Sequence, residues 1–309
     1  MAVTVAATSD FKKIKFEKYP CRIGTDILVG GTMSRFYVIF GVIIAAFAVW
    51  ALYDGMVYRF YKVYTKKLER GVRIAHISDL HSIFHGKNQS RLMKKLDAQK
   101  PDAVMLTGDI FDYKKNPDGA VSFLKQVCKY PCFYVTGNHE HRAGDAKEKT
   151  KLIRALGITA LDGESVRFEM NGGSITVSGI SDIVRRKYDD AEYDFFGAMK
   201  SAFSDIDTSE FNILLVHNNS FADEYKKYPF DLVLSGHAHG GQFRIPFIMN
   251  GFFVRKQGFF PRYAGGMYEH GKLVHIVSRG ISRNPVWCPR IFNPTELVII
   301  DILNEREKR

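Results

Sequence analysis

From Val72 to Leu303, short apolar runs alternate with stretches in which apolar residues recur at helical spacing. This alternation is typical of a mixed α/β domain, since buried strands are apolar over a few residues and surface helices are apolar on one face. The apolar runs predict strands at Val72–Ile77, Ala103–Leu106, Cys132–Val135, Ile213–Val216 and Leu232–Leu234. Helical spacing predicts helices at Ser90–Lys100, Gly119–Lys129 and Lys147–Leu156, the last of which ends before Gly157.

The pattern changes after Ile158, where hairpin signals replace the strand–helix alternation. Two short strands are joined across Asn171-Gly172-Gly173, a turn sequence that favours a hairpin. The elements expected in this second half are strands at Ser165–Met170, Ser174–Gly179, Leu273–Ser278 and Leu297–Leu303, and a helix over Tyr188–Ser204. The fold class predicted is α/β, with two mixed β-sheets packed as a sandwich, flanked by helices and preceded by one transmembrane helix.

The transmembrane prediction comes from Phe36–Tyr53, a run of eighteen residues without a charge. That length is near the minimum that spans a hydrocarbon core, and aromatic residues at both ends suit the membrane interface. A cleaved signal peptide and a buried helix are the alternatives. The buried helix is least favoured because the whole catalytic pattern lies after Val72, and an uncleaved anchor is favoured over a cleaved signal because the candidate cleavage site, Ala46-Phe47-Ala48, lies inside the apolar run. The expected organisation is an uncertain extension (1–32), a membrane anchor (33–56), a basic linker (57–71), the catalytic domain (72–303) and a charged tail (304–309).

Composition and charge narrow the class of partner. The 309 residues are 46% hydrophobic and 25% charged, an ordinary globular balance, and the four cysteines show no metal-site or disulfide spacing. The formal net charge of +11 favours anionic partners such as phosphorylated substrates, anionic lipid or nucleic acid. Part of that charge flanks the apolar run, and no nucleic-acid module motif is present, so nucleic acid is the less favoured partner.

Five blocks rich in potential metal ligands follow the predicted strands. They are Asp79-x-His81, Gly108-Asp109, Gly137-Asn138-His139-Glu140, Val216-His217-Asn218 and Gly236-His237-Ala238-His239-Gly240. Polar residues at the ends of buried strands converge on one rim of a sheet, and carboxylate, amide and imidazole groups suit divalent transition metals. The pattern therefore predicts two metal ions side by side with a carboxylate between them.

The five blocks in this order resemble the calcineurin-like metallophosphoesterase superfamily over roughly Val72 to Leu303, and the text around Gly240-Gly241-Gln242 and Ser278-Arg279-Gly280 resembles a branch of secreted or membrane-associated bacterial phosphodiesterases. The resemblance implies an α/β/β/α sandwich. It also implies two divalent metal ions (Mn, Fe or Zn), one held by Asp79, His81 and His239, the other by Asn138, His217 and His237, with Asp109 bridging them. A tyrosine ligand of the purple acid phosphatase type is not expected, since Asp112 occupies that position.

The resemblance assigns His139 to catalysis, as a residue that stabilises the transition state or protonates the leaving alkoxide, which an imidazole can do near neutral pH. Neighbouring residues have plainer interpretations. Glu140 could orient His139 or face solvent, with solvent slightly favoured, and Asp112 is equally compatible with the surface and with a contact to a metal-bound histidine. Surface or hydrogen-bonded positions are expected for the other histidines, His76, His85, His141, His270 and His275.

An aromatic and basic stretch follows Gln242 and includes Phe243, Arg244, Phe247, Phe252, Phe253, Arg255, Lys256, Phe259, Phe260, Arg262 and Tyr263. One interpretation is a wall that receives a lipid-linked phosphate, with aromatic residues at the membrane interface and cations on the head group. The favoured interpretation is that these residues close the core of the sandwich beside the site.

Taken with the resemblance, these patterns predict a membrane-anchored, metal-dependent phosphohydrolase. It would cleave phosphodiester, phosphomonoester or pyrophosphate bonds with a metal-bridging hydroxide, on a small phosphorylated molecule or a lipid. The expected location is single-pass in the membrane through Phe36–Tyr53, with the catalytic domain on the extracytoplasmic side. A nuclease and a non-catalytic binding protein on the same fold are the alternatives.

Overall fold

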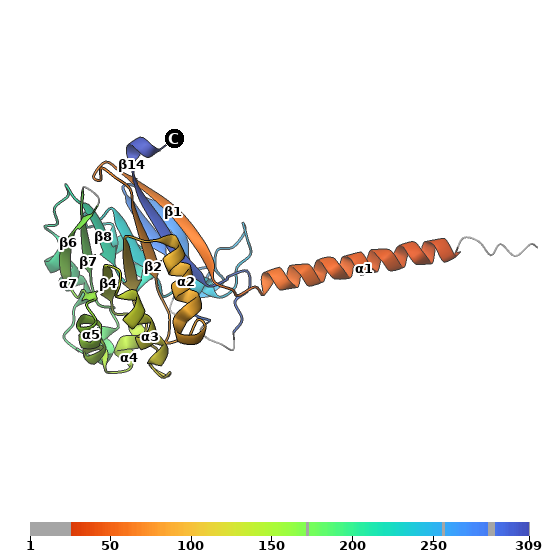
Figure 1. The fold of residues 1–309 in the computed structure, drawn as a ribbon, viewed down its shortest axis with the longest axis horizontal. Coiled ribbons are helices and arrows are strands. Elements are labelled where there is room, and N and C mark those ends of the chain that lie inside the picture. Colours follow the sequence, from red (N-terminus) through yellow and green to blue (C-terminus); the bar gives the residue numbers. More distant parts are fainter. Residues whose placement is uncertain (1–25, 171–172, 255–256, 284–287, 309) are drawn as a thin grey trace, which may run out of the picture. The chain divides into compact units, whose positions relative to one another are not determined.

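The computed structural model describes residues 26–170, 173–254, 257–283 and 288–308, and Figure 1 shows their fold. The strands are β1 (Val57–Thr65), β2 (Val72–Ile77), β3 (Ala103–Thr107), β4 (Cys132–Val135), β5 (Thr159–Ala160), β6 (Glu164–Met170), β7 (Gly173–Gly179), β8 (Phe211–Leu215), β9 (Leu232–Ser235), β10 (Phe253–Val254), β11 (Gly258–Phe259), β12 (Gly266–His270), β13 (Leu273–Val277) and β14 (Glu296–Asn304). The helices are α1 (Asp26–Ala51), α2 (Ser90–Gln99), α3 (Asp118–Val127), α4 (Asn138–Arg142), α5 (Ala146–Ala155), α6 (Arg185–Tyr188), α7 (Phe195–Phe203) and α8 (Ala222–Tyr225), with short 3-10 turns at Lys87–Gln89, Asn219–Phe221, His239–Gly241 and Glu305–Glu307.

Two six-stranded mixed sheets form the domain from Trp50 to Arg309. The first has the order β1-β14-β2-β3-β4-β5 and the second the order β12-β13-β9-β8-β7-β6. Strands β2, β3 and β4 run parallel to one another, as do β7, β8 and β9. Parallel strands end on the same edge of a sheet, which is the arrangement that collects polar residues from distant parts of the chain.

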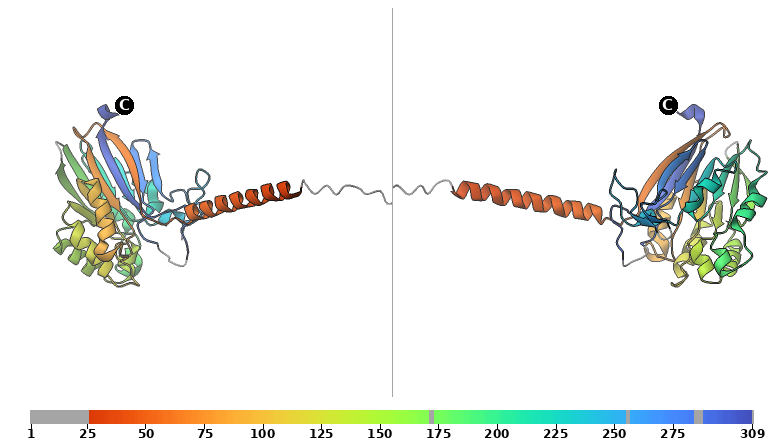
Figure 2. Two further views of the ribbon diagram at one scale, coloured as in Figure 1. Left: turned by 45° about the vertical axis from the view of Figure 1, so that its right-hand side comes forward. Right: turned by 180° about the vertical axis from the view of Figure 1, so that it is seen from behind.

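Three layers of apolar side chains hold the sandwich together, and Figure 2 shows its two sheets from further sides. Along β2, Val72 and Ile74 pack between the sheets while Ala75 and Ile77 pack under the helices. Successive strand residues point to opposite faces, so a strand buried on both faces is apolar throughout. This explains why the central strands appear in the sequence as continuous apolar runs. The predicted sandwich of two mixed sheets flanked by helices is confirmed.

The basic segment 57–71 is not a linker along most of its length. Residues Val57–Thr65 form β1, which pairs in parallel with β14 at the edge of the first sheet. Tyr58 packs against the helix-side core, whereas Tyr61 and Val63 pack between the sheets. This period of two is the strand pattern, and the prediction missed it because Arg59 and Lys62 interrupt the apolar positions.

A second difference concerns Tyr188–Ser204, where one helix was expected. The structure ends α6 at Tyr188 and begins α7 only at Phe195. The intervening residues form turns, with the N–H of Tyr193 donating to the carbonyl of Asp190. Asp189 and Asp190 bind side chains of neighbouring elements instead of continuing a helix.

The predicted membrane anchor coincides largely with helix α1. Within the portion of the chain that the structure describes, no helix has both the length and the apolar character needed to cross a membrane. The structure therefore does not support the expected transmembrane helix. The expected N-terminal extension lies outside the described residues as far as residue 25.

Candidate metal centre

The ligand-rich blocks meet where the parallel strands of both sheets end. Asp79 lies just after β2 and Asp109 just after β3, while Asn138 begins α4 after β4. His217 lies beyond β8 and His237 beyond β9 in the other sheet. The edge of the sandwich therefore brings together residues that are up to 160 positions apart, as the strand pattern predicted.

The backbone of this edge is unusual. Five of the predicted ligands, Asp79, His81, Asp109, His237 and His239, have positive φ angles between 48° and 71°. Residues other than glycine adopt this left-handed conformation rarely and at an energetic cost, and such residues concentrate at functional sites. The surrounding fold therefore holds these side chains in orientations that the backbone would not adopt by preference.

Two glycines allow the turns to approach one another. Gly108 has a φ of 78°, and a β-carbon there would overlap the backbone of Gly137. A β-carbon on Gly137 would in turn meet Asp109, within 3.0 Å of its carboxyl carbon. The close packing of these two turns accounts for the glycines in Gly108-Asp109 and Gly137-Asn138.

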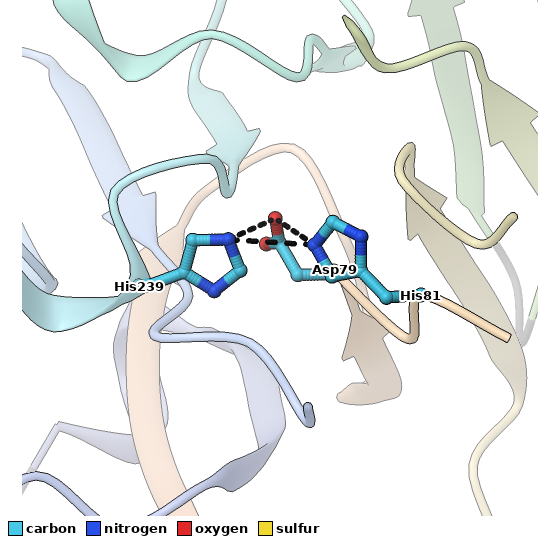
Figure 3. Close-up of side chains that lie close together, drawn as sticks. All are labelled: Asp79, His81 and His239. Carbon is cyan, nitrogen blue, oxygen red and sulfur yellow. Dashed lines mark hydrogen bonds and ion pairs between the residues drawn. The ribbon is translucent and has the colours of Figure 1, made fainter. Parts of the chain in front are cut away.

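The first group of candidate ligands consists of Asp79, His81 and His239, drawn in Figure 3. Asp79 Oδ1 lies 3.5 Å from His239 Nε2 and 3.8 Å from His81 Nε2, and these two nitrogens are 3.4 Å apart. Asp79 Oδ1 is buried and has no hydrogen-bond partner among the described residues. Donor atoms at these separations suit a shared cation, since metal–ligand bonds to nitrogen and oxygen are about 2.0–2.2 Å long.

The second group centres on Asp109 and His217. His217 Nε2 lies 3.3 Å from Asp109 Oδ2 and 3.2 Å from His237 Nδ1. The same Asp109 oxygen is 3.8 Å from His81 Nε2, so it faces both groups. Asn138 is buried at the start of α4 beside this group. The structure thus brings six of the seven predicted ligands within 4 Å of another member of the set, and it buries the seventh, Asn138, at the start of the adjoining helix.

A hydrogen bond behind one imidazole and an ion-pair contact behind another orient the two rings. His217 Nδ1 is 2.7 Å from the carbonyl oxygen of Thr107, which leaves Nε2 facing Asp109. His81 Nδ1 lies 3.3 Å from Asp112 Oδ2, and Asp112 is buried. A carboxylate or carbonyl behind a histidine is the usual support of a metal-ligating imidazole. Of the two alternatives predicted for Asp112, the surface and a contact to a metal-binding histidine, the structure shows the contact to a candidate ligand.

Glu140 does not face solvent as expected. Its carboxylate is fully buried and accepts three backbone hydrogen bonds, from Asp109 at 2.9 Å, Phe111 at 3.0 Å and Gly137 at 2.8 Å. The prediction was wrong because it considered only the helical turn that carries Glu140, whereas two of the amides belong to a loop about 30 residues earlier. Glu140 ties the Asp109 turn to the Asn138 turn.

Three of the other histidines are buried and hydrogen-bonded. His76 contacts Thr107 at 2.8 Å, His275 contacts Ser235 at 2.8 Å, and His141 lies between Thr136 and Asp189. These contacts agree with the hydrogen-bonded role expected of histidines outside the motif. None of the three belongs to a potential metal-binding group among the described residues.

The electrostatic environment favours ionised carboxylates, but its effect on the imidazoles is mixed. Burial acts to lower the pKa of His81 and His217, yet neighbouring carboxylates outweigh it and raise the pKa of His81 to about 9 and that of His217 well above its usual value. Burial tends to raise the pKa of Asp79, but His239 and His81 hold it below its usual value. Burial lowers the pKa of His239 to about 3 and that of His237 to about 4. An ionised carboxylate and a neutral imidazole are the protonation states that bind metals. The residues present therefore fit divalent metal ions by donor type and spacing, and metal binding would release the protons of His81 and His217.

His139 lies at the open side of the same centre. Its Nδ1 is 3.5 Å from Asp112 Oδ2, its Nε2 is 3.9 Å from Asp109 Oδ2, and its backbone N–H donates to Asp109 Oδ1 at 2.7 Å. The ring packs edge-on against His81 and Tyr113, with centroids 4.3 Å and 4.8 Å away. His139 therefore does not lie in the group formed by Asp79, His81 and His239, but with His81 and Asp112 it forms a further group of potential metal ligands.

A comparison with known protein families identifies the family of this chain. The family model of calcineurin-like phosphoesterases matches residues 72–241, the span that carries all five ligand-rich blocks. The chain belongs to this family. The segment that carries the predicted metal ligands is thus the segment that this chain shares with other calcineurin-like phosphoesterases.

Several bacterial members of the family are similar over most of this chain. A metallophosphoesterase of Campylobacter jejuni is 29% identical over 257 residues, which cover 77% of this chain and 61% of that protein. YkuE of Bacillus subtilis is 30% identical over 68% of this chain and 72% of its own length. A metallophosphoesterase of Aquifex aeolicus is 30% identical over 78% of this chain and 90% of its own length.

Proposed function

We propose that this chain is a metal-dependent phosphohydrolase that uses two divalent metal ions to cleave phosphate ester or pyrophosphate bonds. The observation that carries the proposal is the position of Asp109, whose Oδ2 lies within 4 Å of imidazole nitrogens of both ligand groups. Membership of the phosphoesterase family supports the same chemistry. Metals bound there would stabilise phosphoryl charge and activate water as a nucleophile at neutral pH.

The chain's own residues divide the remaining work. Asp79, His81 and His239 would hold one ion, and Asn138, His217 and His237 the other, with Asp109 between them. Asp112 orients His81 and His139 through the contacts at 3.3 Å and 3.5 Å. With Nδ1 of His139 directed to Asp112, its Nε2 would donate a proton to the departing oxygen of the substrate.

We further propose a lipid-linked phosphate as the substrate. The aromatic stretch after Gln242 was expected to be core, but several of its side chains are exposed. Phe247 is fully exposed, Ile248 is 83% exposed, and Phe259 and Phe260 are 64% and 67% exposed. Arg255 and Lys256 of the same stretch lie outside the described residues. Large exposed apolar groups are typical of surfaces that bind apolar ligands or membranes.

This surface lies next to the candidate metal centre. The N–H of Phe252 donates to the carbonyl of Gly241 at 3.1 Å, and Gly241 is two residues after His239. Phe252 also packs against Phe259 and Phe260, with ring centroids 5.2 Å and 5.8 Å apart. The acyl part of a lipid phosphate would lie on these rings while its phosphate reaches the metals.

A panel assay of the full chain, loaded with metal and held in detergent, tests both proposals. It would compare nitrophenyl phosphate, bis-nitrophenyl phosphate, a nucleotide, an oligonucleotide and a lipid pyrophosphate. Hydrolysis of none of them would contradict the proposed activity, and hydrolysis of the oligonucleotide alone would favour the nuclease alternative.

A comparison of variants on a lipid and a non-lipid substrate tests the lipid proposal separately. A Phe247→Ser, Ile248→Ser variant should lose at least about tenfold in turnover of the lipid substrate, because burying each side chain is worth on the order of 1.5–3 kcal/mol. Its hydrolysis of bis-nitrophenyl phosphate should be unchanged. Phe196→Ser, an exposed residue of α7, is the matched control. Equal loss on both substrates would contradict a lipid-binding role.

We also propose that Phe36–Tyr53 attaches the protein to a membrane with the catalytic domain outside the cytoplasm. The support is the uncharged run and the exposure of its large side chains, which include Phe36, Ile39, Phe40, Ile43, Phe47 and Trp50. Protease added to intact cells should digest the domain from Val57 onward while a cytoplasmic control protein survives. Digestion only after lysis would contradict this orientation, and recovery in the soluble fraction would contradict attachment.

A further inference from the structure

Arg290 is a buried cation at the edge of the candidate metal centre to which neither the ligand pattern nor the proposed mechanism assigns a role. Its residue is only 4% exposed, and its Nη2 lies 3.2 Å from Nδ1 of His239. The Nε and Nη1 atoms are buried and make no hydrogen bond to any described residue. A buried N–H group without an acceptor is costly, and more so when it carries charge.

Comparison with Arg279 shows how the chain compensates a buried guanidinium elsewhere. Arg279 is similarly buried, at 5% exposure, and its side chain donates to Glu296 at 3.1 Å, Asn250 at 2.8 Å and the carbonyl of Gly265 at 3.0 Å. Arg290 forms no ion pair with any carboxylate in the described parts of the chain. Its guanidinium therefore lacks the direct ion pair that Arg279 makes with Glu296, and the carboxylates that act on it do so from longer range.

The contact with His239 does not supply an acceptor once His239 binds a cation. Nε2 of His239 faces Asp79, as Figure 3 shows, so the proton of the neutral ring is on Nδ1 when Nε2 is a ligand. A guanidinium can only donate. Two donors would then face each other, and Arg290 would have an unmet need for an anionic acceptor at this position.

The backbone holds Arg290 firmly in place. The segment that carries it runs beside the loop after His239, with the N–H of Ile291 donating to Gln242 at 3.2 Å and the N–H of Arg244 donating to Ile291 at 3.0 Å. The amide of Asn293 also donates to the carbonyl of His239 at 2.8 Å. The segment that carries Arg290 is thus hydrogen-bonded to the loop that carries the candidate metal ligand His239.

We propose that Arg290 binds the phosphoryl group of the substrate, donating to a non-bridging oxygen from the Nε and Nη1 N–H groups, for which the described residues offer no acceptor. This inference rests on the proposed phosphohydrolase function and adds a substrate-binding residue to it. A guanidinium matches phosphate oxygens in charge and geometry, and hydrogen bonds of this kind are among the strongest in proteins. The phosphate would supply the acceptor oxygens that the described residues do not place against Nε and Nη1 of Arg290.

The test measures binding of inorganic phosphate to the full chain loaded with zinc, by titration calorimetry, for wild type, Arg290→Met and Arg290→Lys. Arg290→Met should retain its metal and bind phosphate about 10–100-fold more weakly, since a charged hydrogen bond is worth on the order of 1.5–3 kcal/mol. Arg290→Lys should fall between the two, and added guanidinium should restore part of the affinity of the Met variant. Arg73→Met, which removes an ion pair with Asp301, is the control and should bind phosphate as wild type does.

Phosphate affinity within twofold of wild type in Arg290→Met would overturn the proposal. Loss of metal by Arg290→Met would also overturn it, because the arginine would then serve to hold His239. If the Met variant fails to fold, Arg290→Lys decides, with a loss of at least about threefold expected and an unchanged affinity refuting the role. If the wild-type protein binds phosphate but hydrolyses no substrate, the proposed phosphohydrolase function is refuted. The phosphate affinities of the Arg290 variants would still decide whether Arg290 binds phosphate.

Discussion

Replacing Glu140 should destabilise the whole centre, although Glu140 is neither a predicted ligand nor in contact with substrate. Its buried carboxylate accepts hydrogen bonds from the backbone of Asp109, Phe111 and Gly137. In Glu140→Ala these three amides lose their acceptor inside the protein. A buried donor left unsatisfied costs about 1–3 kcal/mol.

The expected loss in the free energy of unfolding is therefore about 3–6 kcal/mol for Glu140→Ala, allowing for some relaxation and water entry. That is a large part of the 5–15 kcal/mol typical of a folded domain. Glu140→Gln keeps one acceptor oxygen and should lose roughly half as much. Both variants should also bind metal more weakly, because the turn that positions Asp109 is released.

Urea denaturation followed by circular dichroism measures the loss of stability, and elemental analysis of the dialysed protein measures the metal. Hydrogen exchange at the amides of Asp109, Phe111 and Gly137 should be faster in Glu140→Ala than in wild type. Glu148→Gln is the control, since Glu148 is exposed on α5 and has no such contacts. A Glu140→Ala protein that unfolds within about 1 kcal/mol of wild type and keeps its metal would refute this reasoning.

Three further predictions concern the centre and the core. Asp109→Asn should lose both metals or nearly all activity, because one carboxylate faces both ligand groups, and a fully active, metal-free variant would contradict the two-metal proposal. His139→Ala should keep its metals but lose about 10²–10⁴ in turnover, and less on nitrophenyl substrates that need little protonation, whereas loss of metal would make it a ligand. Burial lowers the pKa of His275 from 6.5 to about 3, so the unfolded chain binds more protons below pH 6.5 and stability falls as the pH drops. His275→Gln should remove about 2 kcal/mol of the loss between pH 7.5 and pH 5 in urea titrations, and an unchanged pH dependence would contradict this assignment.

Most of the candidate metal centre could be predicted because its residues lie in short motifs that are recognisable without knowing the tertiary structure. Each ligand-rich block follows an apolar strand, and strand ends meet on one edge of a sheet, so the order of blocks implied a shared site. The misjudged residue, Glu140, lies within such a block. Its environment comes from the Asp109 loop, which packs against it only in the folded domain. Arg290 was missed for the same reason, since it follows no strand and contacts His239 across 51 positions.

The helices and strands were predictable where apolar residues recur at the regular spacing of one buried face. Helices α2, α3 and α5 begin and end within two residues of the predicted bounds, because their apolar stripes are regular. Strand β1 was not predicted, because its charged residues hide the alternation and its partner β14 is more than 200 residues away. The exposure of Phe247 and Phe260 was also misjudged, since composition alone favours the core for any phenylalanine.

The sequence alone determined the chemistry of this protein, because the ligand types and their order after strands are local properties of the chain. It also determined the two-sheet sandwich, because periodicity records which faces are buried. Only the tertiary structure decided which polar residues are buried, which hydrogen bonds orient them, and which cation lacks a partner. Burial and pairing depend on segments that meet from distant parts of the chain, and no local pattern carries that information.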